Sequence, residues 1–450
     1  MRLPAVVFSF LTVFSIGMRP VFCQQAGDSE LLTLDQAVKL AQQHNRLLRS
    51  YALEVRKYED KAAQTRTLRL PSFSLYSLSM QRFTALDFVF PKGAFGVFPG
   101  IGAVPATETT IRSPLRLATL LVGRVDQPLS QQYRISLSLH ALDLGRQIAA
   151  EQVQAQQQTV INQVKDTYYS IMQMQSALAC AQESIKLYKE LDRVTEQYVQ
   201  QQVALKAESL EIKTRLAKAE YDALTIRNPM QTQKENLNNL LGRDLQTEFR
   251  VEAVPEPPDV GMDLAEAKRL ALQQRPELRQ ARLKVEQAEY DRRIKKSEYI
   301  PDISLNFSYL SPFNFGPLVP NNIAGAGLLV NWEPLDWGKK KHELAEKSRT
   351  VTQAELALDE TKNQISIEVA SKFRKVEETR QLVVVTQSAR ETALEKLRVV
   401  KNRYAQEAFL LKDVLQAEAA LAEANSQYQQ AVQSHWTACA DFEKALSGGY

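Results

Sequence analysis

The 450-residue chain has little of what enzymes, metalloproteins and nucleic-acid-binding proteins usually carry. Its four histidines are scattered, and the H-E-x-x-H, G-x-S-x-G, G-x-x-x-x-G-K-[ST] and C-x-x-C motifs are all missing. We therefore expect no enzyme activity, no cofactor and no metal site. The net charge is only +4, because 56 basic residues are offset by 52 acidic ones. No basic block is interleaved with aromatic residues, so we expect no nucleic-acid partner.

Cysteine is scarce too, and one of the three cysteines lies in an unusual N-terminal segment. Arg2 precedes an apolar run from Val6 to Ile16, and Cys23 follows shortly after. This pattern predicts that residues 1–25 are a secretory signal peptide. A lipoprotein signal with an acylated Cys23 is the alternative, although Phe22 is bulky where a lipobox has a small residue.

The other two cysteines are Cys180 and Cys439, both within predicted helices. Free Cys is among the most buried residue types, so we expect two small buried thiols. Their similar distances from two predicted hairpin turns leave a disulfide in an oxidising compartment as an alternative.

Glycine (16) and proline (18) are rare, which favours long helices. Beyond the N-terminal segment, no stretch approaches the ~18 consecutive apolar residues of a membrane helix. A helix is predicted from Gln131 to about Gln200, and another from Lys339 to about Ala405. At 1.5 Å per residue, each would be a rod of about 100 Å. Return helices are predicted at Glu208–Leu241 and Lys412–Leu446.

The most informative feature present is an internal repeat. Residues from Leu34 to Leu75 match residues from Leu264 to Leu305 at a constant offset without a gap. The matched pairs include Ala37 with Ala267, Leu40 with Leu270, and Pro71 with Pro301. Self-similarity of this kind indicates repeated structural units. We predict two units, residues 26–242 and 263–448, joined by a linker at 243–262.

Each unit is predicted to run helix, strand, loop, strand, long helix and return helix. The first helices, Leu34–Leu68 and Leu264–Glu298, each end just before a proline. The predicted strands cover about 72–82, 117–126, 302–310 and 326–333. Four prolines are predicted to mark the strand–helix junctions: Pro71, Pro128, Pro301 and Pro334.

The clearest strand alternates strictly between two kinds of side chain. Ile303, Leu305, Phe307 and Tyr309 alternate with Ser304, Asn306 and Ser308, which predicts one apolar and one polar face. Transmembrane strands have about this length, but a closed barrel needs at least about eight of them. Four strands with open edges cannot lie in lipid. Other subunits must therefore complete the sheet, or the sheet lies outside the membrane.

The return helices carry apolar residues at a seven-residue spacing that predicts coiled-coil packing. Leu410, Val414, Ala417 and Leu421 begin one such stripe, and His435 lies further along it. We expect His435 to be a packed or water-bonded histidine and not a ligand.

The element order and several motifs resemble the TolC-type outer-membrane efflux proteins over about residues 32–448. The motifs are L-x-x-A-x-x-L-A from Leu34 and from Leu264, N-L-L-G at 239–242, E-P-L-D-W-G at 333–338 and R-Y…D-V-L-x-A at 403–417. The resemblance implies a mainly α fold with a β-barrel portion. In that family, a homotrimer forms a twelve-stranded outer-membrane β-barrel continuous with a periplasmic α-helical coiled-coil tunnel, and residues 243–262 would lie in its equatorial region.

The function that this resemblance implies is the channel-tunnel of a tripartite efflux or type I secretion system. Such a duct sits in outer-membrane lipid and passively carries substrates delivered by an inner-membrane transporter and a periplasmic adaptor (membrane fusion) protein. The alternative is a periplasmic structural or adhesin-like coiled-coil protein without channel activity. The strand pairs at matching positions in both halves argue against that alternative.

The resemblance also places a periplasmic entrance, or gate, at the tips of the helical hairpins. Tyr404 and Asp413 match the family's tip tyrosine and first constriction aspartate, whereas Gln416 occupies the position of the second aspartate. Phe409 and Glu407 replace an arginine and a glycine that are common there. Asp413 could equally be a helix N-cap or a first-turn acid.

One predicted loop is unusually apolar. Residues 88–105 read FVFPKGAFGVFPGIGAVP. Packing of this loop on itself is the simplest expectation, and a plug of a barrel mouth or a binding surface are the alternatives.

Overall fold

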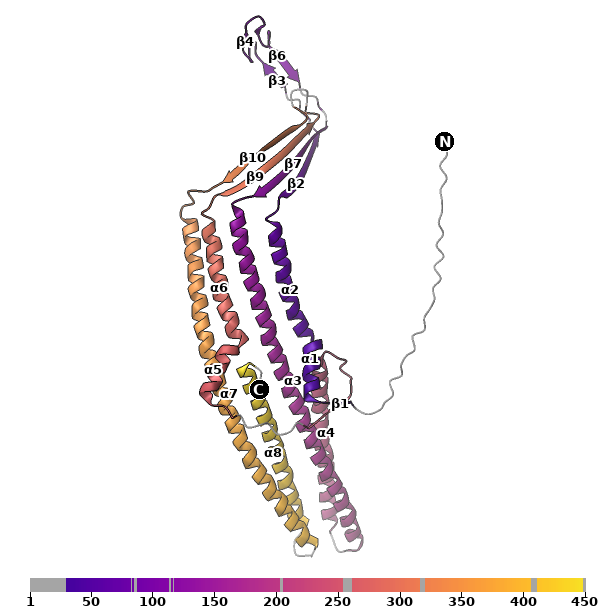
Figure 1. Cartoon of the computed structure of the whole chain (residues 1–450). Helices are drawn as coiled ribbons and strands as arrows, with labels where there is room; N and C mark the ends of the chain where they lie inside the picture. Colours follow the sequence, from indigo (N-terminus) through magenta and orange to yellow (C-terminus); the bar gives the residue numbers. More distant parts are fainter. Residues whose placement is uncertain are drawn as a thin grey trace, which may run out of the picture.

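The computed structural model describes residues 30–81, 83–84, 87–112, 115, 117–202, 205–253, 261–315, 320–405 and 411–447. The predicted signal peptide and Cys23 lie outside these residues. The molecule is long and narrow (Figure 1): a bundle of helices carries a four-stranded sheet at one end, and a small hairpin extends beyond the sheet. No helix among the described residues is long and apolar enough to cross a membrane.

The long helices lie as the sequence predicts. They are α3 (Gln131–Gln200), α4 (Lys206–Leu241), α7 (Lys339–Ala405) and α8 (Leu411–Leu446). Next to the sheet, the helices stand side by side in the order α2 (Arg46–Thr67), α3, α6 (Pro276–Ser297), α7. At the opposite end the order is α4, α3, α8, α7 (Figure 1). Pairs of shorter helices therefore continue along the two long rods.

The first helix of each half is two helices, so the prediction of single helices there is wrong. The structure contains α1 (Leu34–His44) and α2 (Arg46–Thr67), then α5 (Leu264–Gln274) and α6 (Pro276–Ser297). At the first break, the Asn45 side chain accepts hydrogen bonds from the backbone N–H groups of Leu47 and Leu48. This caps α2, while the backbone of Asn45 itself is non-helical, with φ -60° and ψ 126°. At the second break, Pro276 at the start of α6 disfavours helical backbone at Arg275.

The sheet has the strand order β10-β9-β7-β2, and all neighbouring strands are antiparallel. Its members are β2 (Ser72–Gln81), β7 (Leu117–Pro128), β9 (Asp302–Phe313) and β10 (Ile323–Asn331). All four strands lie where the sequence places them. The connection between β9 and β10 is shorter than the predicted strands imply, because β9 continues to Phe313 and β10 already begins at Ile323.

The apolar segment between β2 and β7 is strand-containing, so its description as a loop is incomplete. β3 (Asp87–Phe90) pairs with β6 (Thr109–Arg112), and β4 (Val97–Phe98) pairs with β5 (Gly102–Ala103) within them. The Phe90 and Phe95 rings lie 5.1 Å apart. The segment therefore pairs with itself through its backbone, but Val97 and Ile101 are each 76% exposed, so the expected packing of its apolar side chains on one another is only partial.

The best-buried part of the bundle surrounds a short parallel strand pair, β1 (Glu30–Leu32) and β8 (Phe249–Val251). β8 lies within the predicted linker 243–262. The fully buried Tyr168 of α3 places its hydroxyl 2.8 Å from the Leu32 carbonyl oxygen and 3.0 Å from the Glu252 N–H, which donates to it. Gly242 ends α4 at φ 70°, and a Cβ there would lie 2.3 Å from the His44 carbonyl oxygen, so only glycine fits.

The structure also describes the two cysteines, Cys180 of α3 and Cys439 of α8, and the histidine His435 of α8. Cys180 and Cys439 are both free, so the alternative of a disulfide does not apply. His435 lies with Nδ1 3.1 Å from the Thr379 hydroxyl of α7. This is the packed histidine that the coiled-coil stripe predicts.

Candidate functional site

One face of the sheet is lined by apolar side chains from all four strands. Directly opposed residues in antiparallel strands project from the same face, and Phe73, Val125 and Phe307 form one such row. We call this surface the apolar face; it contains Phe73, Leu75, Leu121, Val125, Ile303, Leu305, Phe307, Tyr309, Leu328 and Val330. Phe73 and Leu75 are 79% and 76% exposed. A continuous exposed apolar surface of this kind marks contact with a membrane or with another chain.

The other face of the sheet is polar next to the helices. Two rows cross it: Ser72 opposes Asp126 and then Asn306, and Ser74 opposes Arg124 and then Ser308. The Asn306 side-chain N–H donates to Asp126 Oδ1 at 2.6 Å. We call these six residues the polar face. Farther from the helices, the rows contain apolar residues such as Leu120 and Leu310, a change that the alternation in the sequence does not predict.

Both edges of the sheet lack a partner strand. Among the described strands, β2 pairs only with β7, and β10 pairs only with β9. Their outer N–H and C=O groups are therefore available to another chain. The helices below these edges expose apolar side chains as well: Leu53 of α2, Tyr221 and Leu224 of α4, and Leu356, Ile367, Val384 and Val385 of α7.

The residues predicted at the entrance lie around the turn between α7 and α8, at the end of the bundle farthest from the sheet (Figure 1). Tyr404 belongs to the last turn of α7, and its side chain is outside the described part of the structure. Asp413 is in the first turn of α8 and is half-buried, and Gln416 is exposed one turn further. The structure thus brings the three residues to one end of the molecule, and Phe409 and Glu407 lie outside the described residues.

The four predicted junction prolines occupy the connections between strands and helices. Pro71 lies between α2 and β2, and Pro301 lies between α6 and β9. Pro128 is the last residue of β7, and Pro334 lies between β10 and α7. Proline fixes φ and lacks an N–H donor, so it suits the points at which one hydrogen-bonding pattern stops and another begins.

A buried polar cluster between α3, α7 and α8 was not found from the sequence. The Asn162 side-chain N–H donates to Asp441 Oδ1 at 2.9 Å and to Asp166 Oδ2 at 3.3 Å, and Lys372 pairs with Asp441 at 2.6 Å. Burial, together with the nearby Asp441 carboxylate, raises the pKa of Asp166 to about 6. The residues are far apart in the sequence, so no local spacing could have signalled the cluster.

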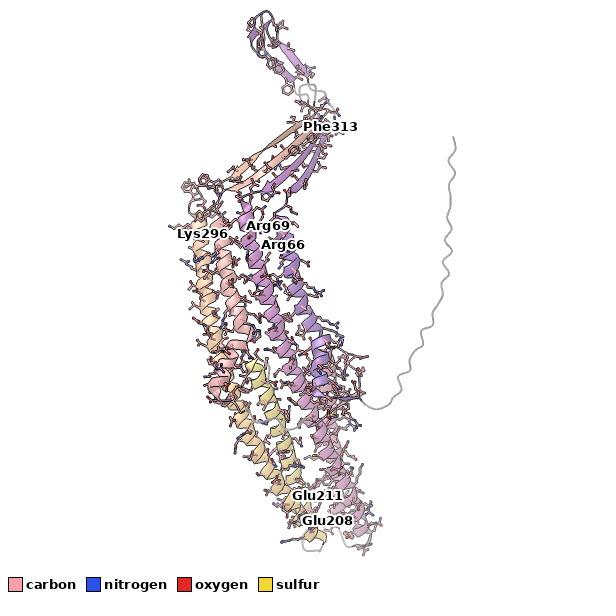
Figure 2. All side chains as sticks on the ribbon, viewed as in Figure 1. Arg66, Arg69, Glu208, Glu211, Lys296 and Phe313 are labelled. Atoms are coloured by element: carbon pink, nitrogen blue, oxygen red, sulfur yellow. The ribbon has the colours of Figure 1, made fainter. Side chains whose placement is uncertain are left out.

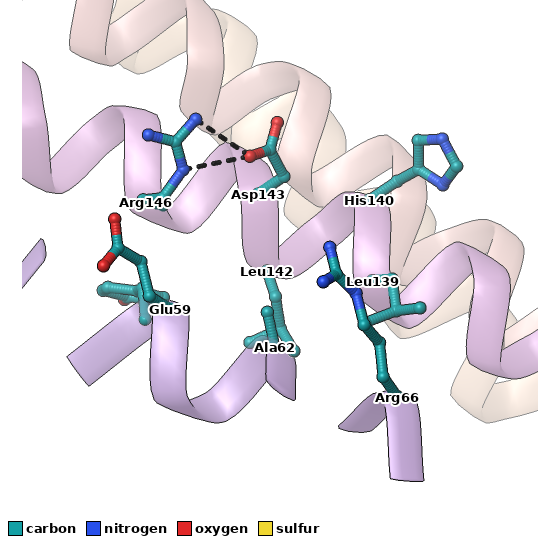
Figure 3. Close-up of a pocket in the computed structure, with 9 residues that line it drawn as sticks. Glu59, Ala62, Arg66, Leu139, His140, Leu142, Asp143 and Arg146 are labelled. Carbon is teal, nitrogen blue, oxygen red and sulfur yellow. Dashed lines mark hydrogen bonds and ion pairs between the residues drawn. The ribbon is translucent and has the colours of Figure 1, made fainter. Parts of the chain in front are cut away.

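A cavity of about 400 Å³ lies between α2 and α3 (Figure 3). Its lining contains both charges, Glu59 and Asp143 together with Arg66 and Arg146, and Asp143 forms an ion pair with Arg146. A hydrogen bond from Gln147, and then one from Arg146, lower the pKa of Asp143. No group of three or more His, Cys, Asp or Glu side chains that could hold a metal ion occurs in the described part of the chain. The ion pair between Asp143 and Arg146 is partly exposed to solvent.

Comparisons with known proteins agree with this geometry. The family model described as "Outer membrane efflux protein" matches residues 268–448. The fold matches the outer-membrane channel OprN with a TM-score of 0.73 and 19% identity, over 92% of this chain and 90% of that one. It matches the Campylobacter jejuni CmeC outer membrane channel with a TM-score of 0.75 and 14% identity, over 100% and 94% of the two chains. Residues 268–448 thus match the outer-membrane efflux protein family, and the fold of the whole chain resembles that of outer-membrane channels.

A curated relative extends the comparison to the sequence level. "Toxin and drug export protein A" of Aggregatibacter actinomycetemcomitans is 21% identical over 227 residues, or 49% of this chain and 50% of that protein. The matched region spans about half the length of the curated relatives. The predicted resemblance to this efflux family is confirmed, as is the mainly helical fold with a β portion.

Proposed function

We propose that the protein is the outer-membrane channel-tunnel of a tripartite efflux or type I secretion system. Three copies would close a twelve-stranded barrel in the membrane and a helical tunnel across the periplasm. An inner-membrane transporter and a periplasmic adaptor would deliver substrates, and the duct would carry them passively.

The observation that supports this proposal most directly is that neither edge strand of the sheet, β2 or β10, has an outer partner among the described strands. The edge formed by β10 and α7 and the edge formed by β2, α2 and α4 lie on opposite sides of the chain (Figure 1). Two different edges can join only head to tail, and a head-to-tail interface either closes into a ring or grows into a filament. A four-stranded sheet in lipid requires closure, because its edge groups would otherwise remain unsatisfied. Three copies give twelve strands, within the range of known barrels.

The two faces of the sheet fit opposite sides of such a barrel. The apolar face would meet lipid, and the polar face would line the lumen. Arg124 and Asp126 would then place one positive and one negative charge per subunit near the point at which barrel and tunnel join. Charged rings of this kind tune the ion selectivity of pores.

The opposite end of the tunnel would be the periplasmic entrance. Tyr404, Asp413 and Gln416 would lie around its constriction, with one carboxylate per subunit from Asp413. Because Gln416 is neutral, the constriction would hold a single acidic ring, which attracts cations less strongly than two rings do.

The assignment of segments completes the proposal. Residues 1–25 would be a signal peptide that directs export, and residues 26–242 and 263–448 would be two copies of one ancestral unit. The connection 243–262 would be the equatorial segment, since β8 within it pairs with β1 beside the middle of the bundle.

A direct test combines assembly state with conductance. The full chain, extracted in detergent, should have the mass of a trimer by native mass spectrometry and should open stable channels in planar bilayers. A protein that is monomeric and stays in solution without detergent would contradict the proposal and would support a periplasmic coiled-coil role.

A further inference from the structure

Unpaired positive charges gather where the helices meet the sheet. Arg66 and Arg69 lie at the end of α2, Lys296 lies at the end of α6, and Lys339 and Lys341 lie at the start of α7. Figure 2 shows Arg66, Arg69 and Lys296 at the level at which the bundle ends and the sheet begins. All five side chains are exposed. We call these five residues the cationic collar.

The carboxylates at the same level already form hydrogen bonds or ion pairs with groups outside the collar. The side chain of Asp336 accepts hydrogen bonds from the backbone N–H groups of Gly338 and Lys340, which caps α7. The ion pairs here join Lys295 with Glu298 and Glu343, Arg134 with Asp302, and Lys340 with Glu333. None of the five collar residues forms an ion pair with a described carboxylate, so the collar has a net positive charge.

Exposed aromatic side chains share this level. Trp332 and Trp337 lie between β10 and α7, Tyr299 lies between α6 and β9, and Tyr133 lies in the first turn of α3. Trp337 is 91% exposed and Trp332 is 59% exposed. Trp and Tyr are enriched at membrane–water boundaries, because one part of the ring system is apolar and another donates a hydrogen bond.

We propose that the cationic collar binds anionic phospholipid headgroups of the periplasm-facing leaflet. This inference rests on the proposed function, which puts the sheet in the membrane and the helices in water. Each Lys or Arg near a negatively charged membrane surface adds attraction that falls off within a Debye length. The aromatic residues fix the depth of the boundary, and the collar lies on its aqueous side. The collar therefore selects phosphatidylglycerol over zwitterionic phosphatidylcholine.

The experiment measures lipid selection by the full-length protein in detergent. Equal amounts of phosphatidylglycerol and phosphatidylcholine are added, and bound lipids are counted by native mass spectrometry. The wild type should bind phosphatidylglycerol at about tenfold excess, and the excess should fall as NaCl is raised from 0.15 M to 1 M, because the Debye length shortens from about 8 to about 3 Å. A variant with glutamine at all five collar positions should bind the two lipids about equally.

A matched control removes five exposed positive charges from the helices far from the sheet. Its substitutions, all to glutamine, are at Lys206, Lys218, Arg227, Lys396 and Lys401. The control should keep the wild-type preference. Equal binding of both lipids by the wild type, or an equal loss in the collar and control variants, would overturn the proposal. Displacement of the lipid by inorganic phosphate beyond that by chloride at equal ionic strength would also overturn it, because the collar would then be a free-phosphate site. Trimer mass and conductance, measured separately, report on the proposed function itself.

Discussion

The sheet and the helical body bury apolar side chains to very different extents. In the bundle, Val164, Val369 and Ile212 are completely buried, and the chain alone supplies their surroundings. In the sheet, every residue of the edge strands β2 and β10 is exposed. Much of the helical body therefore has a core of its own, whereas the sheet leaves its apolar side chains uncovered; in the proposed assembly, lipid and neighbouring subunits would cover them. Under the proposed function, the two ends would differ in this way because one lies in lipid and the other in water.

The sharpest way to break this comparison is to place a charge on each face of the same strand. Leu305→Arg puts a charge on the apolar face and should cost about 2–4 kcal/mol near the bilayer midplane. Asn306→Arg, on the adjacent residue of the polar face, should be tolerated. The measurement is the yield of detergent-resistant trimer in the membrane fraction. Normal assembly of Leu305→Arg together with failed assembly of Asn306→Arg would invert the assignment of the faces.

A cysteine at the same polar position sharpens the result. Asn306→Cys should react with a water-soluble thiol reagent that enters through the pore, because Asn306 and Asp126 lie on the face that we assign to the lumen. Leu305→Cys in the assembled protein is the matched control and should be protected by lipid. Equal labelling of both positions would argue against a membrane-inserted sheet.

The helical body should respond to pH through Asp166. Its folded pKa of about 6 exceeds the usual 3.8, so the folded state binds more protons between these values. Stability from this group is therefore greatest at low pH and falls as pH rises through about 4 to 6. Two pKa units correspond to at most about 3 kcal/mol, and partial exposure reduces this value. Asp166→Asn should thus be stabilising at pH 8 and nearly neutral at pH 4.

The measurement for Asp166→Asn is thermal unfolding followed by helical circular dichroism at both pH values. Asp359→Asn is the control, since Asp359 forms an exposed ion pair with Lys362 one turn away. A stability difference between Asp166→Asn and wild type that is the same at pH 4 and pH 8 would contradict the assignment.

The hydroxyl at the centre of the body is expected to contribute less. Tyr168→Phe removes the hydrogen bonds that link α3 to β1 and to the residue after β8, and it should destabilise the protein by about 1–2 kcal/mol. Tyr133→Phe, at a side chain that is 56% exposed, should have almost no effect. Urea unfolding of both variants measures the difference, and equal midpoints would mean that the Tyr168 hydroxyl is not structural.

The smallest effect on stability is expected at the far end of the bundle. As a first-turn acid, Asp413 contributes only about 0.5–1 kcal/mol to α8. Asp413→Ala should nevertheless change single-channel conductance and weaken its block by multivalent cations. Asp35→Ala removes the first-turn acid of α1, away from the entrance, and should leave conductance as in the wild type. Unchanged cation block in Asp413→Ala would reduce Asp413 to its capping role.

The fold was largely predictable because its determinants are local and occur twice. Strict alternation from Ile303 to Tyr309 and the long proline-free segments specify strands and rods without knowledge of the tertiary structure. The sequence also indicates the helix break at Arg275, since Pro276 follows it. The break was missed because the helical spacing of apolar residues continues on both sides of it. The break at Asn45 depends on its side chain, which caps α2. The same side chain also donates a hydrogen bond from Nδ2 to the Leu240 carbonyl oxygen of α4, and this tertiary contact cannot be seen in the sequence.

The candidate site was less predictable because it depends on register and on distant contacts. The rows that join Ser72, Asp126 and Asn306 exist only once three strands are aligned. The cluster around Asn162 joins α3 to α8, and the collar joins residues from three separate junctions. In each case, the residues come together only through the tertiary structure, and their spacing in the sequence does not indicate this.

The two unlike edges of the chain also determine how it can assemble. A dimer joined head to tail has one free β2 edge and one free β10 edge, the same number as a single chain. Joining a second copy pairs two edges and leaves two exposed, whereas a third copy that closes the ring pairs all four edges that remain, two on the dimer and two of its own. Assembly should accordingly be all-or-none, with partial rings scarce at every concentration and the rate of trimer formation rising more steeply than linearly with the amount of chain in the membrane.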